Sequence, residues 1–200
     1  MSSALRWVGR LRLGLLIASL ATGSAWALTE TLTSEAVARA ERGSMALQAQ
    51  IRVYFTPGNS AETAIAETIA TAHRQIRVQA YSFTNPLIVQ ALADAQSRGV
   101  AVTVILDKSN RTQKYSAADF SHHSGIETLI DDRHAIAHNK IMIIDDSVVI
   151  TGSYNFTRAA EKSNAENVVI IESGPIAQKY LQNWQKHRQH AEPYRARTGQ

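Results

Sequence analysis

Apolar and polar positions change their spacing several times along the chain, and these changes predict alternating strands and helices. Short runs rich in Val and Ile, bounded by polar or turn-forming residues, are typical of buried strands. Longer segments with apolar positions at helical spacing separate several of these runs. Strands are predicted at 51–55, 76–82, 102–106, 126–130, 141–144, 148–151 and 168–171, and helices at 61–72, 87–98 and 176–189.

Strands and helices that alternate at this interval predict an α/β fold. Right-handed crossovers would join the strands into a mostly parallel mixed sheet sandwiched between helices. In the last helix we expect Leu181 and Trp184 to pack into the core. The apolar fraction of 44% in 200 residues is ordinary for a globular enzyme with one core.

The first 27 residues form a separate segment. Arg6, Arg10 and Arg12 precede an apolar run, and Ala25 and Ala27 place small residues where signal peptidase reads them. Polar residues interrupt the run, whereas a membrane anchor needs about 20 apolar residues. We expect a signal peptide at 1–27, a lead-in segment at 28–49, one folded domain at 50–194 and a tail at 195–200. The protein would then be periplasmic or secreted, with no stable membrane anchor after cleavage.

Signal cleavage changes the charge balance of the chain. The segment carries three Arg and no acidic residue, so Lys plus Arg falls from 21 to 18 against 17 Asp plus Glu. The formal net charge falls from +4 to +1. Any affinity for a polyanion must therefore come from a local patch of cations rather than from the overall field. The sequence has no Cys, which excludes disulfides.

The densest chemical signal lies between residues 138 and 155, where the sequence reads HxKxxxxDxxxxxxGSxN. Side chains alternate along a strand, so His138 and Lys140 are expected to project from the same face. A turn that begins at Asp145 joins the predicted strand at 141–144 to the predicted strand at 148–151. A hairpin of this length would return Ser153 and Asn155 to the neighbourhood of His138.

These residue types favour an anionic substrate over a bound metal. The Lys140 ammonium would repel a divalent cation, and no HxH or HExxH pattern lies nearby. We therefore expect no metal and no cofactor. A phosphate group matches a lysine charge together with Asn and Ser donors. A neutral His138 could attack phosphorus, and Glu166 is the best carboxylate to orient its ring, although an exposed Glu166 at a strand start remains an alternative.

The spaced pattern resembles the HKD motif of the phospholipase D superfamily. Residues 80–84, 152–157 and 165–167 further resemble its small bacterial endonuclease branch, and the similarity covers about residues 50–194. The resemblance implies a phosphodiesterase with the phospholipase D/nuclease fold and a catalytic domain at 50–194.

The resemblance also implies roles for the residues of the pattern. His138 would be the nucleophile, and Glu166 would pair with it. Lys140 and Asn155 would bind the phosphoryl oxygens, and Ser153 would support them.

Asp145, the acidic residue of the motif, would have a structural or electrostatic role by the same resemblance. Phospholipases D of the long type carry two such motifs per chain, whereas this chain has one. In-line displacement needs an acid on the leaving oxygen. We therefore expect a homodimer that places two His138 side chains in one cleft.

A polar stretch directly after the strand at 102–106 is a candidate substrate-binding segment. Lys108, Arg111 and Lys114 could contact phosphates, and Tyr115 could stack on a base; a solvated loop is the alternative. We favour an exported, metal-independent, nonspecific DNA/RNA endonuclease. A phospholipase D or cardiolipin-type hydrolase acting on phospholipid and a noncatalytic nucleic-acid or envelope-binding module remain open.

The other histidines carry weaker signals. His134 lies four residues before the motif histidine, and we expect it to be a surface-loop residue; a place on the rim of the cleft is the alternative. No carboxylate that could converge on them is evident in the sequence around the remaining histidines, His122, His123, His187 and His190. The sequence gives no reason to assign them a role.

Overall fold

The computed structural model describes residues 35, 49–58, 60–113 and 117–196. The chain divides into two compact units, residues 1–48 and 49–200, and the fold below is that of the second unit. The expected signal peptide and nearly all of the lead-in segment lie outside the described residues. Within the described part of the chain, no helix has the length and apolar character needed to cross a bilayer.

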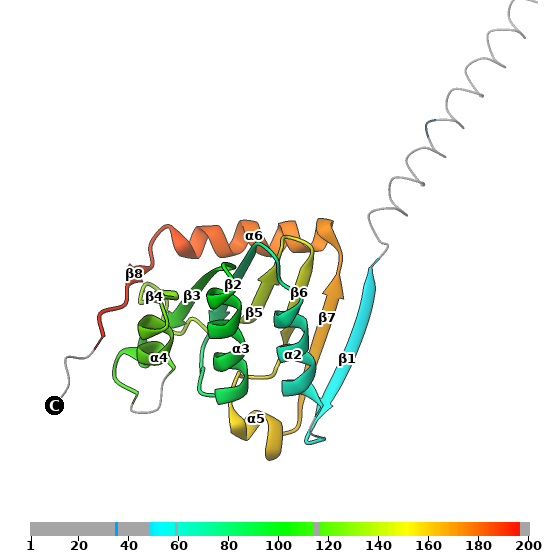
Figure 1. Ribbon diagram of the computed structural model, residues 1–200, viewed down its shortest axis with the longest axis horizontal. Coiled ribbons are helices and arrows are strands. Elements are labelled where there is room, and N and C mark those ends of the chain that lie inside the picture. The colour runs from blue at the N-terminus through cyan, green and yellow to red at the C-terminus, as the bar shows by residue number, and fades with distance from the viewer. Residues whose placement is uncertain (1–34, 36–48, 59, 114–116, 197–200) are drawn as a thin grey trace, which may run out of the picture. The chain divides into compact units, whose positions relative to one another are not determined.

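One eight-stranded sheet forms the centre of the second unit, in the order β1-β7-β6-β5-β2-β3-β4-β8 (Figure 1). Every predicted strand is present, and the α/β class with a mixed sheet is confirmed. A short eighth strand was not predicted, because two residues carry no periodic signal. The strands are β1 (Gln50–Thr56), β2 (Gln75–Ala80), β3 (Ala101–Asp107), β4 (Glu127–Asp131), β5 (Lys140–Ile144), β6 (Val148–Gly152), β7 (Glu166–Glu172) and β8 (Glu192–Pro193).

The expected predominance of parallel pairs is wrong. Among the seven neighbouring pairs of this sheet, only β2–β3 and β3–β4 are parallel, and the other five are antiparallel. Parallel neighbours need a long crossover, whereas antiparallel neighbours can be joined by a tight turn. Only a three-residue turn separates β5 from β6. The second half of the sheet is therefore a meander rather than a series of crossovers.

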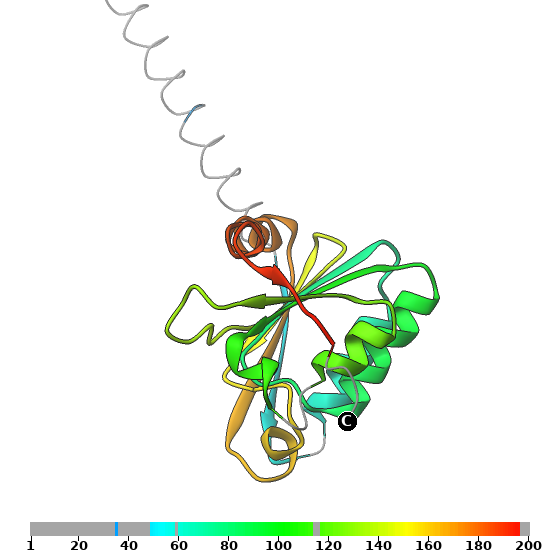
Figure 2. The ribbon, with the colours of Figure 1, turned by 90° about the vertical axis from the view of Figure 1, so that its left-hand side faces the viewer.

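Helices cover both faces of the sheet (Figure 2). On one face lie α2 (Ala61–Ala70), α3 (Pro86–Ser97) and α4 (Ala118–His123), and on the other lies α6 (Gly174–Arg188). The short helix α4 was not predicted from the sequence. The sheet thus separates two hydrophobic cores.

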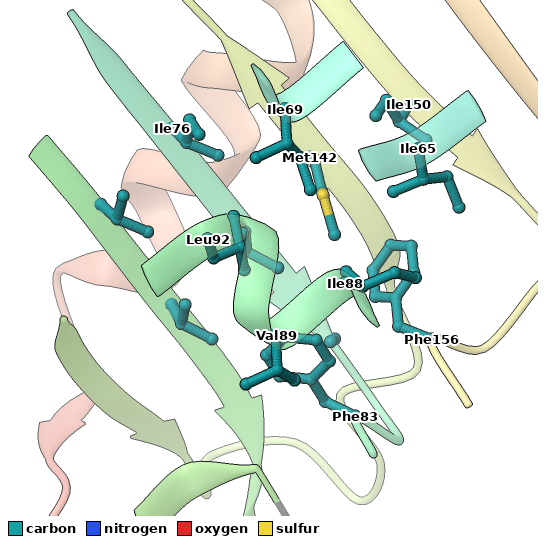
Figure 3. Packing of buried hydrophobic residues seen from close by; sticks show 14 of the residues in the cluster. Ile65, Ile69, Ile76, Phe83, Ile88, Val89, Leu92, Met142, Ile150 and Phe156 are labelled. Carbon is teal, nitrogen blue, oxygen red and sulfur yellow. The ribbon is translucent and has the colours of Figure 1, made fainter. Parts of the chain in front are cut away.

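The larger core lies under α2 and α3 (Figure 3). Ile65 and Leu92 from these helices are fully buried, as is Met142 from β5. The smaller core lies under α6, where Leu181 and Trp184 are buried, which confirms their predicted packing role. The Trp184 Nε1 group also donates a hydrogen bond to the carbonyl of a β2 residue.

The directions of the strands place the candidate catalytic residues at one edge of the sheet. Strands β2, β3, β4 and β6 end at the edge where β5 and β7 begin. The short helix α5 (Arg158–Lys162) lies at this edge (Figure 1). Lys140, Gly152 and Glu166 mark the start of β5, the end of β6 and the start of β7, so residues far apart in sequence are neighbours in space.

Candidate active site

His138 and Lys140 lie at the start of β5 in different environments. His138 is exposed, whereas Lys140 is only 8% exposed. The Lys140 Nζ donates a hydrogen bond to the carbonyl oxygen of His138 at 3.0 Å. Because β5 begins at Lys140, His138 precedes the strand, so strand alternation does not set its direction; the hydrogen bond ties the Lys140 ammonium to the His138 backbone.

Tyr81 packs against both residues and was missed in the sequence. Its ring centroid lies 4.7 Å from that of His138, and the Lys140 Nζ lies 5.4 Å from the Tyr81 ring centroid. The Tyr81 backbone N–H also donates to the carbonyl of Asn139 at 3.0 Å. Its position directly after β2, within the segment 80–84 that carries part of the family resemblance, was the available signal. Tyr81 therefore restricts where the imidazole and the ammonium can lie.

The Lys140 side chain is buried at this edge of the sheet, where little solvent reaches its ammonium group. Burial lowers the pKa of Lys140 from its ordinary value of 10.5, and the negative charge of Glu166 acts in the opposite direction. The two charged groups are therefore close enough to interact, and the site combines one cation with one carboxylate.

Ser153 and Glu166 form a hydrogen-bonded unit beside Lys140. The Ser153 Oγ donates to Glu166 Oε2 at 2.6 Å and accepts from the Asn167 backbone N–H at 3.1 Å. Asn164 Nδ2 donates to the other carboxylate oxygen at 3.0 Å. Among the described residues, no hydrogen bond joins Glu166 to His138. The expected pairing is absent within one chain, and Glu166 instead holds Ser153 and faces Lys140.

Asn155 has an available polar group at this edge. Its Oδ1 is buried and makes no hydrogen bond with any described residue. A buried acceptor without a partner costs free energy, and such groups in native proteins usually have a structural or functional explanation. The amide can rotate to present either its oxygen or its nitrogen. Asn155 is therefore suited to meet a bound ligand.

The loop that carries these residues depends on Gly152 at the end of β6. Gly152 has φ 150°, and a Cβ at this position would lie 2.1 Å from the Asn167 carbonyl oxygen. The absence of a side chain allows the loop to pass directly over the start of β7. Tyr154 and Phe156 are buried and anchor the loop from below, so Ser153 and Asn155 stay at the surface of the sheet edge.

Asp145 lies at the opposite end of β5 from Lys140, away from the other residues of the pattern. Its carboxylate accepts hydrogen bonds from the backbone N–H groups of His73, Arg74 and Gln75 at 2.8–2.9 Å. Burial alone would raise the pKa of Asp145, but these three hydrogen bonds and the charge of Arg74 together lower it. Asp145 therefore ties the β5–β6 turn to the start of β2.

We expect Asp145→Ala to destabilise the fold by about 2 kcal/mol, because a charged acceptor of three backbone amides is lost. Turnover by the protein that remains folded should stay within about threefold of wild type, since Asp145 lies at the opposite end of β5 from Lys140. Asp145→Asn keeps the side-chain shape and should cost less. The stabilising carboxylate is present above its ordinary pKa of 3.8 and is lost as the pH falls through the lowered value. Denaturant titrations at several pH values should therefore show the stability difference between Asp145→Asn and wild type shrinking below about pH 4.

The candidate substrate-binding stretch begins with the 3₁₀ helix η1 (Lys108–Arg111) at the end of β3. The Lys108 Nζ donates to the His134 carbonyl at 2.9 Å. Arg111 forms ion pairs with Asp132 at 3.1 Å and Glu192 at 2.9 Å. These cations lie near the site edge but are engaged within the protein. Lys114 and Tyr115 lie outside the described residues, so their predicted roles stay predictions.

The structure also brings together histidines that the sequence left without a role. His187 and His190, at the end of α6, both contact the carboxylate of Asp131 at the end of β4. These two histidines have no carboxylate near them in sequence, and the fold supplies one. His134 is exposed on its loop, as predicted, but its ring also contacts Asp131. Asp131 lies more than fifty residues from His187 and His190 in sequence, so no local pattern reveals these two contacts.

The site combines an exposed imidazole, a buried ammonium, and amide and hydroxyl groups around them. These groups suit a phosphodiester substrate, and such a site on an α/β sheet defines a class of phosphoryl-transfer enzymes. Comparisons with known proteins narrow that class. Residues 65–188 match the family described as cardiolipin synthase, PLD-like domain. The chain belongs to the phospholipase D superfamily, and it is a phosphodiesterase.

Three relatives illustrate the family. A phospholipase D from Rickettsia bellii is 47% identical over 137 residues, which cover 68% of each chain. The solved structure of a phospholipase D family member, Nuc from Salmonella typhimurium, is 38% identical with a TM-score of 0.71; the match covers 74% of this chain and 100% of that one. A mitochondrial cardiolipin hydrolase from Xenopus tropicalis is 30% identical over 122 residues, 61% of this chain and 58% of the relative.

Proposed function

We propose that the protein is an exported, metal-independent, nonspecific DNA/RNA endonuclease that acts as a homodimer through a phosphohistidine intermediate. The observation that carries the proposal is the exposed imidazole of His138 beside the buried ammonium of Lys140, at an edge where loops bring further cations. Lys108 follows β3, Arg133 follows β4 and Arg158 begins α5, so three separate segments at this edge each contribute an exposed basic residue.

The first chemical step is displacement at phosphorus. The free electron pair of a neutral His138 nitrogen attacks the phosphorus atom, and the bond from phosphorus to the leaving oxygen breaks. Lys140 and the Asn155 amide bind the non-bridging oxygens, whose charge they stabilise. An acid on the opposite side gives its proton to the leaving oxygen. The product of this step is a phosphoryl group bound covalently to His138.

The second step is hydrolysis of that intermediate. The group that gave up its proton is now a base, and it takes a proton from water as the water oxygen attacks phosphorus. The phosphorus–nitrogen bond breaks, and its electron pair returns to His138. The cleaved phosphate product leaves with one oxygen from water, and both catalytic groups recover their starting protonation.

The acid in this scheme is the reason for proposing a homodimer. Among the described residues of one chain, His134, His187 and His190 contact Asp131, and His122 and His123 lie in the last turn of α4, so His138 is the one imidazole at the site edge that remains for this role. A twofold axis beside His138 would supply the second imidazole from an identical residue. Ile136, two residues before His138, is 57% exposed, and such an apolar side chain is suited to a contact between the two copies.

Mixing wild-type protein with His138→Ala protein tests the shared site. If both imidazoles are needed and subunits exchange, activity depends on the square of the wild-type fraction, so an equal mixture should give about one quarter of full activity. If each chain carried a complete site of its own, the equal mixture would instead give about one half of full activity. Sedimentation of the same mixture should show a dimer. A proportional fall in activity, or a fully active monomer, would contradict the homodimeric site.

Nucleic acid is favoured over lipid because the site edge offers exposed cations from separate loops. Cations spread along an edge can follow successive phosphates of a strand, and they read no base edges, which accounts for nonspecific cleavage. A phospholipid is the second candidate. It is favoured by relatives named phospholipase D and mitochondrial cardiolipin hydrolase and by the exposed Ile136 beside His138.

Parallel assays with plasmid DNA, RNA and phosphatidylcholine vesicles separate the two substrates. We expect DNA and RNA to be cut, with rates that fall steeply as salt rises, and little release of choline. Arg133→Ala/Arg158→Ala should slow cutting of DNA about tenfold or more while leaving hydrolysis of bis(p-nitrophenyl) phosphate nearly unchanged. Lys179→Ala, an exposed lysine on α6, is the matched control. Faster turnover of vesicles than of DNA would favour the phospholipase instead.

Export rests on the basic and apolar pattern of residues 1–27. Cleavage near Ala27 would release the catalytic unit into the periplasm or the medium. N-terminal sequencing of protein recovered from those fractions should begin close to residue 28. Recovery of uncleaved protein in the cytoplasm alone would contradict export.

A further inference from the structure

We infer that Asp131, His134, His187 and His190 form a binding site for a transition-metal ion, with Zn²⁺ as the best-fitting ion, separate from the residues of the phosphodiester site. Each residue offers one ligand atom, and these atoms all lie within 4.8 Å of one another. One carboxylate oxygen and three imidazole nitrogens form a donor set that Zn²⁺ prefers. The inference does not depend on the proposed nuclease function.

The four side chains converge from two elements that are distant in sequence. Asp131 ends β4 and His134 lies in the loop after it, whereas His187 and His190 lie in and just beyond the last turn of α6. The carboxylate of Asp131 has no exposed side-chain surface, and it lies 3.1 Å from His134 Nδ1 and 2.7 Å from His187 Nδ1. His190 Nε2 lies 3.2 Å from its other oxygen.

The spacing of the ligand atoms is close to that of a tetrahedral zinc site. With bonds of about 2.0–2.1 Å, neighbouring ligand atoms of tetrahedral Zn²⁺ lie about 3.4 Å apart. The widest separation of 4.8 Å must contract by about 1.4 Å to reach this spacing, which rotations of the side chains can provide. The His134 side chain is 45% exposed, so an ion can reach the cluster from solvent.

Three imidazoles around one carboxylate are more than the hydrogen bonding of Asp131 requires. Adjacent rings in the cluster have centroids only 4.9–5.6 Å apart, so protonating all three would place like charges close together. The three rings surround one buried carboxylate, and neutral imidazoles that share a metal ion with it avoid this repulsion.

An ion at this position would fasten the loop before His138 to the C-terminal helix. Lys108 already binds the His134 carbonyl, and Asp107 Oδ2 accepts the Ala137 N–H at 2.8 Å, so the loop is attached to β3 on one side. The metal would attach it to α6 on the other side. Its expected effect is on stability and loop position, while the phosphoryl chemistry stays with His138 and Lys140.

The test is metal binding by purified protein that has been stripped with a chelator and dialysed. Zn²⁺ added in competition with a chromogenic chelator should bind at one ion per chain, with Kd of about 1 µM or tighter. Free Zn²⁺ at about 100 times Kd should raise the melting temperature by about 5–10 °C. Co²⁺ in its place should give the intense visible bands of a four-coordinate site.

The double variant His187→Gln/His190→Gln should bind Zn²⁺ about 100-fold more weakly, with circular dichroism confirming its fold. The matched control is His122→Gln/His123→Gln, which removes two histidines from α4 and should bind like wild type. If the double variant does not fold, His190→Gln alone gives the same comparison. Absence of stoichiometric binding by wild type, or equal binding by the cluster variant, would overturn the site.

One further measurement separates this site from the catalytic chemistry. Hydrolysis of bis(p-nitrophenyl) phosphate, measured below the melting temperatures of both forms, should continue in the chelator-stripped protein. Retained hydrolysis with a lowered melting temperature supports a stabilising metal beside a metal-independent active site. Loss of hydrolysis on stripping, restored by Zn²⁺, would contradict metal-independent chemistry and leave the binding result standing.

Discussion

His138→Ala should lower the rate of phosphodiester hydrolysis by about 10⁴-fold or more while leaving the fold intact. Alanine removes the nitrogen that we propose attacks phosphorus, and no described side chain next to it offers a replacement nucleophile. The ring is exposed and its main packing contact is Tyr81, so the free energy of unfolding should change by less than about 1 kcal/mol. Steady-state rates with a small diester, together with denaturant titration, measure both effects.

His123→Ala is the matched control for that variant, because His123 is an exposed histidine on α4. It should keep full activity. Substantial turnover by His138→Ala, beyond contamination by wild-type enzyme, would show that the imidazole is not the nucleophile. A loss of fold in the same variant would leave activity uninterpretable, which the denaturant titration detects.

Gly152→Ala should produce the largest loss of stability among single substitutions at the site. The new Cβ would lie 2.1 Å from the Asn167 carbonyl oxygen, and φ 150° is unfavourable for a residue with a side chain. We expect a loss of about 3–5 kcal/mol, measured by thermal or denaturant unfolding. Because the clash pushes β6 and β7 apart, hydrolysis by the remaining folded protein should also fall.

Gly174→Ala is the control for that substitution. A Cβ at Gly174 meets no atom within 4 Å, and the residue begins α6, where alanine is favoured over glycine. Its stability should stay within about 0.5 kcal/mol of wild type or increase slightly. Equal stability of the two glycine variants would show that the backbone can relax around Gly152 and that close packing of β6 on β7 is not required.

The sequence predicts those parts of the fold that depend on local periodicity. Each strand of more than two residues and the three long helices follow from apolar spacing, and so does the burial of Trp184. Short elements such as α4, α5 and β8 contain too few residues to show a period. The balance of parallel and antiparallel pairs also depends on how distant strands pair, which local patterns do not report.

For the candidate site as well, the sequence predicts which residues take part but not which of them contact one another. The residues around His138 are recognisable because they lie in one spaced pattern. Their contacts are not, since Glu166 meets Ser153 and faces Lys140 instead of binding His138. The histidine cluster on Asp131 depends on α6 folding back against the end of β4. Its sequence signals are two separate pairs of residues three positions apart, Asp131 with His134 and His187 with His190, and nothing local joins the pairs.

The stereochemical course at phosphorus tests the central claim most directly. A diester made chiral at phosphorus by one sulfur, hydrolysed in water labelled with a heavy oxygen isotope, reports whether displacement occurs once or twice. Two in-line displacements, first by His138 and then by water, predict overall retention of configuration. Inversion would show direct attack by water on the substrate and would contradict the phosphohistidine intermediate.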